Sequence, residues 1–144
     1  MANRTRYTNR VSPGSVRAPG TAAAWWPEGE GTISELIEFG DVSALTGTVT
    51  IGTVPAGARY LWSNVQVITA FNAGANDALV VGLSSDTNFL VTDGHPTTAD
   101  SETEGEIMDW LPTTDQTIIA TYTHTSTAPT TGKAVVTVRF KLPL

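Results

Sequence analysis

The sequence predicts an all-β protein: an antiparallel β-sandwich, jelly-roll-like, with an extended N-terminal arm. Threonine accounts for 24 of the 144 residues. Together with Val and Ile it favours strands, because β-branched side chains suit a pleated surface better than a helix. About seven or eight short apolar runs follow one another at spacings of roughly 10 residues, with turn-forming residues between them. Such spacing is typical of sandwiches and jelly rolls.

The chain divides into an arm over residues 1–31 and a β-sandwich domain over residues 32–144. The arm is rich in Pro, Gly and small residues, which cannot bury enough apolar area to fold alone, so we expect it to become ordered only against a partner. The remainder has the length of one domain with one hydrophobic core. Because the chain has no cysteine, neither a disulfide framework nor a thiolate metal site is available.

The first elements of the sandwich are predicted from apolar spacing. Residues 33–39 form either a short strand or a single helical turn, which ends at Gly40. Residues 48–53 alternate as in a strand with one buried face, on which lie Val49, Ile51 and Thr53. Residues 55–57, Pro-Ala-Gly, form a turn, and we expect a hairpin to follow.

The longest apolar run covers residues 59–71, and its inward-facing set changes phase near Ser63 and Asn64. Either both faces of this strand are covered, or a β-bulge shifts its register. A loop at residues 72–77 leads into a strand at 78–83, and a short strand follows at 89–91.

Residues 92–109 carry six acidic side chains and no Lys or Arg. A connection of this length is often functional, and the alternative is a solvated excursion that keeps the protein soluble. Residues 117–123 and 133–142 then form a closing pair of strands around a turn. In the last strand one face is apolar and comprises Val136, Val138, Phe140 and Leu142.

Charge is divided unevenly along the chain. The first 27 residues contain four arginines and no carboxylate, whereas the rest contains four basic and fourteen acidic residues. A short basic arm on an acidic body favours a protein that attaches to a partner. Arginine forks bind carboxylates and phosphates, and Trp, Tyr and Arg commonly anchor interfaces. The predicted partner-binding residues are Arg4, Arg6, Tyr7, Arg10, Arg17, Trp25 and Trp26. The alternative is a disordered tail whose arginines are merely solvated.

Catalytic and metal-binding patterns are sparse, and we expect no enzyme, no cofactor and no metal. The two histidines, His95 and His124, lie near no Gly-x-Ser-x-Gly elbow and are expected at the surface. Acidic residues at 86–88 or 100–104 offer oxygen ligands for calcium but do not match an EF-hand loop. Trp62 and Trp110 suggest a sugar-stacking platform only if both are exposed, and burial in a sandwich core is more common.

The acidity of the body disfavours a nucleic-acid partner, since phosphate contacts need a concentrated basic face. No window approaches 18 apolar residues and no secretory signal begins the chain, so we expect a soluble protein made in a cytoplasm, with no membrane contact.

Three segments of the body carry a family resemblance. They are Val-Pro-Ala-Gly-Ala at 54–58 before a long strand, the turn-rich stretch 69–77 leading into Leu-Val-Val-Gly at 79–82, and Ala-Pro-Thr-Thr-Gly at 128–132 before the terminal strand. In these turn-and-strand patterns the chain resembles the small β-sandwich virion proteins of tailed bacteriophages, especially head decoration or cement proteins. The resemblance does not include the arm, and it carries no catalytic residues.

The resemblance implies a non-enzymatic protein that forms a homotrimer on the outer capsid surface of the virion after synthesis in the cytoplasm of a bacterial host. It implies the major capsid protein as partner and stabilisation of the contacts between capsomers as the role. Three alternatives stay open: a tail, collar or head-fibre structural component, a carbohydrate-binding module, and a polysaccharide-degrading enzyme.

Overall fold

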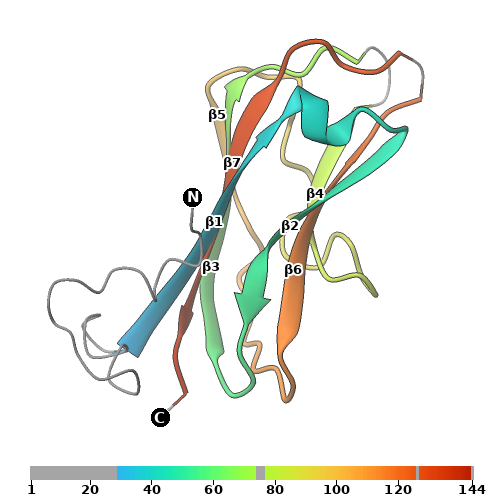
Figure 1. Cartoon of the computed structure of the whole chain (residues 1–144). Helices are drawn as coiled ribbons and strands as arrows, with labels where there is room; N and C mark the ends of the chain where they lie inside the picture. The colour runs from blue at the N-terminus through green and yellow to red at the C-terminus, as the bar shows by residue number, and fades with distance from the viewer. Residues whose placement is uncertain (1–28, 74–76, 126, 144) are drawn as a thin grey trace, which may run out of the picture.

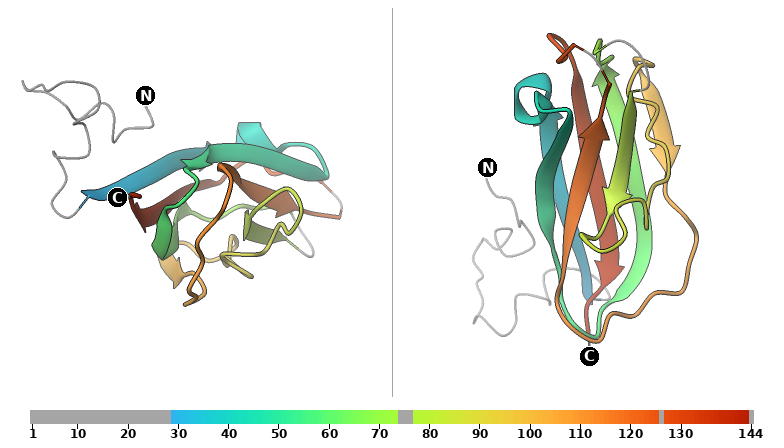
Figure 2. Two further views of the ribbon diagram at one scale, coloured as in Figure 1. Left: turned by 90° about the horizontal axis from the view of Figure 1, so that it is seen from below. Right: turned by 90° about the vertical axis from the view of Figure 1, so that its right-hand side faces the viewer.

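The computed structural model describes residues 29–73, 77–125 and 127–143. Within them the chain forms seven strands and one short 3-10 helix (Figure 1), in the order β1 (Glu30–Glu38), η3 (Phe39–Val42), β2 (Thr46–Val54), β3 (Arg59–Thr69), β4 (Ala78–Gly82), β5 (Ser101–Glu104), β6 (Gln116–Thr123) and β7 (Lys133–Lys141). A four-stranded sheet, in the order β1-β7-β3-β5, packs on a three-stranded sheet, in the order β2-β6-β4 (Figure 2). The predicted all-β sandwich is confirmed.

The strands pair in order from the two ends of the sequence toward its middle. β1 pairs with β7, β2 with β6 and β3 with β5, all antiparallel, and Val91 forms an isolated bridge to Val81 of β4. An antiparallel ribbon folded over in this way is a jelly roll, in which the segment around Val91 takes the place of an eighth strand.

This topology overturns two expectations about neighbouring strands. The hairpin predicted at residues 55–57 does not form, because β2 and β3 belong to different sheets. β6 and β7, predicted as a closing pair, are both present but also lie in different sheets. Both connections cross from one layer to the other, so that each sheet can bury its apolar face against the opposite sheet. Strand periodicity cannot report this choice, because the buried face is the same whichever strand lies alongside.

Bulges shift the register of β2 and β3. In β3 the register shifts between Tyr60 and Trp62 and again between Val67 and Thr69. Bulges, one of the two predicted alternatives, are therefore present, but on either side of Ser63 and Asn64 and not at these two residues. In β2 a shift between Thr50 and Gly52 buries Val54. Thr53, predicted on the buried face, is therefore exposed.

The core lies between the two sheets and is built mainly from β-branched and aromatic side chains. β7 contributes four fully buried residues, Ala134, Val136, Val138 and Phe140, as its alternation predicts. Residues 33–39 combine the two predicted structures, because β1 ends at Glu38 and η3 begins at Phe39. β1 begins at Glu30, inside the range assigned to the arm. Nowhere in residues 29–73, 77–125 and 127–143 is a helix long and apolar enough to span a membrane.

Candidate partner-binding surface

The seven residues predicted to bind a partner all belong to the arm and lie outside the described residues: Arg4, Arg6, Tyr7, Arg10, Arg17, Trp25 and Trp26. What the structure does show is where the arm joins the body. The Gly29 carbonyl oxygen accepts a hydrogen bond from the Leu142 backbone N–H at 2.6 Å. The arm therefore leaves the sandwich at the end where β1 and β3 begin and β7 ends (Figure 1).

Three of the four basic residues that follow residue 28 gather at this end. In the sheet register Lys141 of β7 lies beside Arg59 of β3, and Arg139 is two residues away on β7. The Arg139 guanidinium lies 2.5 Å from a Glu30 carboxylate oxygen, and that of Arg59 lies 3.3 Å from Asp109. These exposed pairs contribute only about 0–1 kcal/mol each. Because each pair is close to neutral, the uncompensated positive charge at this end, among the described residues, is that of Lys141.

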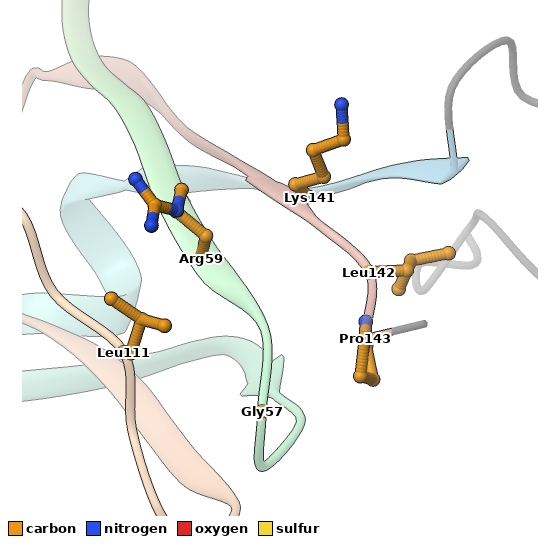
Figure 3. A pocket seen from close by; sticks show the side chains of 6 residues that line it. All are labelled: Gly57, Arg59, Leu111, Lys141, Leu142 and Pro143. Atoms are coloured by element: carbon orange, nitrogen blue, oxygen red, sulfur yellow. The ribbon is translucent and has the colours of Figure 1, made fainter.

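A hollow of about 290 Å³ opens beside the root of the arm (Figure 3). It is lined by Gly57, Arg59, Leu111, Lys141, Leu142 and Pro143. Leu111 lies on one side, Leu142 and Pro143 lie on the other, and the two cations come from the neighbouring strands β3 and β7. Gly57 has a φ of 83°, which a residue with a side chain rarely adopts, and its N–H donates to the Pro112 carbonyl oxygen at 2.8 Å.

The acidic stretch at residues 92–109 contains strand β5, which forms an edge of the four-stranded sheet. Glu102 and Glu104 lie opposite Gln66 and Asn64 of β3 and are exposed. The alternative of a solvated excursion fits the carboxylates of this stretch, which face solvent, while the backbone of Ser101–Glu104 is paired with β3. Charged side chains on an edge strand also discourage pairing with the edge of another molecule.

The chain stays attached to β3 beyond the end of β5. The Gly105 N–H donates to the Ser63 carbonyl oxygen at 2.9 Å, and the Tyr60 N–H donates to the Trp110 carbonyl oxygen at 3.0 Å. The Tyr60 hydroxyl donates to the Glu106 carbonyl oxygen at 3.1 Å and lies 2.7 Å from Ser63 Oγ. Burial raises the pKa of Tyr60, so the hydroxyl keeps its proton to a higher pH than an exposed tyrosine does.

Six of the seven exposed large apolar side chains of the described residues fall into two groups, and the seventh is Leu45. Leu61, Ile107 and Leu111 belong to the paired stretch formed by the start of β3 and residues 105–111, and Ile107 is wholly exposed. Leu36, Phe39 and Ile68 lie toward the opposite end of the four-stranded sheet, where β1 ends. Exposed apolar groups of this kind commonly mark contacts with other proteins.

The remaining candidate residues do not assemble a reaction site. His95 is exposed, with Nδ1 3.4 Å from an Asp93 carboxylate oxygen. His124 is only 3% exposed and lies 5.8 Å from the Tyr122 ring, so its predicted surface position is wrong. It follows the last residue of β6, at a point where the strand still packs on the core. Among the described residues, no group of three or more His, Asp or Glu side chains is placed to hold a metal ion.

Trp110 is a packing residue. Its ring meets Phe89 edge-on at a centroid distance of 5.1 Å and lies 6.3 Å from Tyr60, and the side chain packs against the core. Trp62 is half-buried on β3, beside Arg139 of β7. The predicted preference for burial over a sugar-stacking platform fits the packing of Trp110.

No protein-family model and no curated protein matches the sequence, but several solved structures match the fold. One is a chain of the capsid asymmetric unit of cyanophage Pam1, with a TM-score of 0.63 and 16% identity over 79% of this chain and 85% of that one. A chain from the acid-stable capsid of Helicobacter pylori bacteriophage KHP30 matches with a TM-score of 0.63 and 18% identity, over 80% of this chain and 89% of that one. A chain from the capsid of Ralstonia phage GP4 matches with a TM-score of 0.56 and 12% identity, over 80% of this chain and 85% of that one. What these comparisons show is a shared fold.

Two features of this surface have no signal in the sequence. Arg59 and Lys141 are far apart in the chain and become neighbours only because β3 pairs with β7. Ile107 stands in an acidic stretch without apolar periodicity, so nothing indicated that it belongs to a segment paired with β3. Knowledge of the strand order would have been needed to find either.

Proposed function

We propose that this protein is a decoration or cement protein of a phage head, which binds the outer surface of the shell and stabilises contacts between capsomers. The observation that carries the proposal is the structural match, which extends over about four fifths of this chain to chains from the capsids of three phages. Sequence identity below 20% to all three explains why the likeness is visible mainly in the fold. The role is mechanical and needs no catalytic group.

The basic arm supplies the grip on the shell. Arg4, Arg6, Arg10 and Arg17 contact carboxylates of the major capsid protein, for which the planar guanidinium is well suited. Lys141 at the root of the arm, which has no carboxylate partner among the described residues, extends the positive charge onto the body, where Arg59 and Arg139 are paired with Asp109 and Glu30. The exposed carboxylates of β5 lie on the far edge of the same sheet and face solvent.

A homotrimer makes this attachment strong. The three arms of one trimer bind neighbouring capsomers. Once the first arm is bound, each further arm binds at a high effective concentration. The exposed Leu61 and Ile107 are the apolar residues that a contact between subunits would cover. A contact between two different patches closes into a ring when the rotation between subunits is one third of a turn.

The test compares shell binding by three versions of the protein, each shown by circular dichroism to be folded. Replacing Arg4, Arg6, Arg10 and Arg17 by Glu should abolish co-sedimentation with phage heads that lack the protein. The matched control, Lys133→Glu, changes a cation at the opposite end of the body and should bind as the unchanged protein does. Undiminished binding by the arm variant would remove the arm from the mechanism.

The position of the protein in the particle is tested separately. Cryo-electron microscopy of the virion should show density for the sandwich on the outside of the head, at the joints between capsomers. Density on the tail, the collar or a head fibre would instead support the alternative structural role. The mass of the isolated protein in solution should be that of a trimer, and a monomer would contradict the trimeric arrangement.

A further inference from the structure

We infer that the hollow beside the root of the arm is the seat of the Trp25-Trp26 pair of the same chain. The hollow has an apolar lining from Leu111, Leu142 and Pro143, and Leu111 is 48% exposed. An apolar hollow of this kind is favourable for a protein only when another apolar group fills it.

Chain length confines the two tryptophans to this end of the sandwich. Gly29 is hydrogen-bonded to Leu142, which itself lines the hollow. Trp26 and Trp25 precede Gly29 by three and four residues, so their Cα atoms stay within about 14 Å of it even if the chain is fully extended. The opposite end of the sandwich is about 30 Å away, the length of the nine-residue strand β2. Whatever path the chain takes, the pair remains near the hollow.

The lining of the hollow suits an indole ring. Aromatic rings bind cations that approach their faces, and Arg59 and Lys141 stand at the hollow on neighbouring strands. Among the described residues Lys141 has no carboxylate partner, whereas Lys133, Arg59 and Arg139 each have one. The volume of about 290 Å³ is near the lower limit of small-ligand pockets, which span about 300–1,000 Å³. One indole fills this space, and the second covers its rim.

The seat would give the arm a fixed starting point. With the pair held, the arginines from residue 4 to residue 17 begin at a defined place on the body, which lowers the entropy that is lost on binding. Only this consequence rests on the proposed capsid role, and the seat itself does not.

Disulfide trapping in the full-length protein tests the seat, because the natural chain has no cysteine. Trp25→Cys or Trp26→Cys is combined with Leu111→Cys, and the isolated protein is oxidised without any phage shells. We expect at least one of the two pairs to form a disulfide within one chain, identified by peptide mass mapping. The control combines each change with Leu45→Cys, an exposed residue next to the start of β2 at the opposite end, and should give no such bond.

Two results would overturn the inference. A disulfide that links two chains, seen as a dimer on a non-reducing gel, would show that the tryptophans occupy the hollow of another copy. The absence of a disulfide in both Leu111 pairs, with folding verified by circular dichroism, would show that the hollow is not their seat.

A second measurement does not depend on cysteine. In a chain with Trp62→Phe and Trp110→Phe, fluorescence reports only the arm pair, and acrylamide should quench it several-fold more strongly after Leu111→Asp than after the control Leu45→Asp. Equal quenching in the two variants would contradict the inference. Neither measurement involves a capsid, so a failure of shell binding leaves both results interpretable.

Discussion

The hydroxyl of Tyr60 offers a direct test of how the acidic segment is held on the sheet. In the variant Tyr60→Phe the ring keeps its packing against Trp110, and only the hydroxyl is lost. The change removes the hydrogen bond to the Glu106 carbonyl oxygen at 3.1 Å and the one shared with Ser63 Oγ at 2.7 Å. Solvent can replace the first at this partly buried site. Ser63 is fully buried, so its hydroxyl loses a partner that water cannot replace.

The expected cost follows from these two partners. A buried polar group left without a partner costs about 1–3 kcal/mol, so we expect the free energy of unfolding to fall by that amount. In a urea titration this corresponds to a midpoint lowered by about 1 M, because the slope for small domains is about 1–3 kcal/mol/M. Amide exchange at Gly105 and Glu106, whose N–H groups donate to the Ser63 and Leu90 carbonyl oxygens, should accelerate, since the hydroxyl holds this segment.

A double-mutant cycle with Ser63→Ala completes the test. If Tyr60 and Ser63 act through their shared hydrogen bond, the double variant should cost less than the sum of the two single changes. The control is Tyr122→Phe, which removes a separate hydrogen bond to Asp77 and should add to Tyr60→Phe. An unchanged urea midpoint for Tyr60→Phe, or strict additivity with Ser63→Ala, would refute the reasoning.

Three further predictions concern pH, the sheet edge and the core. Burial raises the pKa of both Tyr60 and Tyr122, so above pH about 10 only the unfolded chain readily loses these protons. Stability measured by urea titration should therefore be complete below pH 10 and fall above it, and it should fall less when both tyrosines are Phe. Replacing Glu102 and Glu104 by Val should cause association by light scattering, whereas Gln at both positions, which is polar but uncharged, should cause less. Phe140→Ala should cost about 3–5 kcal/mol in chemical denaturation, and a loss below about 1 kcal/mol would contradict its place in the core.

Much of the fold could be predicted from the sequence because it rests on local rules. Alternation of apolar residues in β7 placed its buried face correctly, and the phase change near Ser63 indicated a bulge in β3 as one of two alternatives, a few residues from where the register shifts. The turn at residues 55–57 also lies where Pro and Gly predicted it. Each of these features depends on residues within a few positions of one another, so one stretch of chain carries the whole signal.

The part of the candidate site that lies in the arm stays a prediction, and it rests on the division of charge between arm and body. The sequence shows that the early residues are basic and that the body is acidic. It does not show that Arg59, Arg139 and Lys141 stand around the root of that arm. His124 was misplaced for a similar reason, since a polar residue at the end of a Thr-rich run carries no mark of the ring that packs beside it.

The sequence by itself determined the all-β class, the turns and the division of charge, because backbone propensity, side-chain alternation and ionisation are properties of short segments. Only the tertiary structure decided which strands pair, that the acidic stretch forms an edge strand and that a hollow lies beside the root of the arm. Strand pairing joins residues from opposite ends of the chain, and β1 with β7 is the clearest case. Such contacts depend on how two sheets share one core, and the local pattern of a strand is the same for every partner it could take.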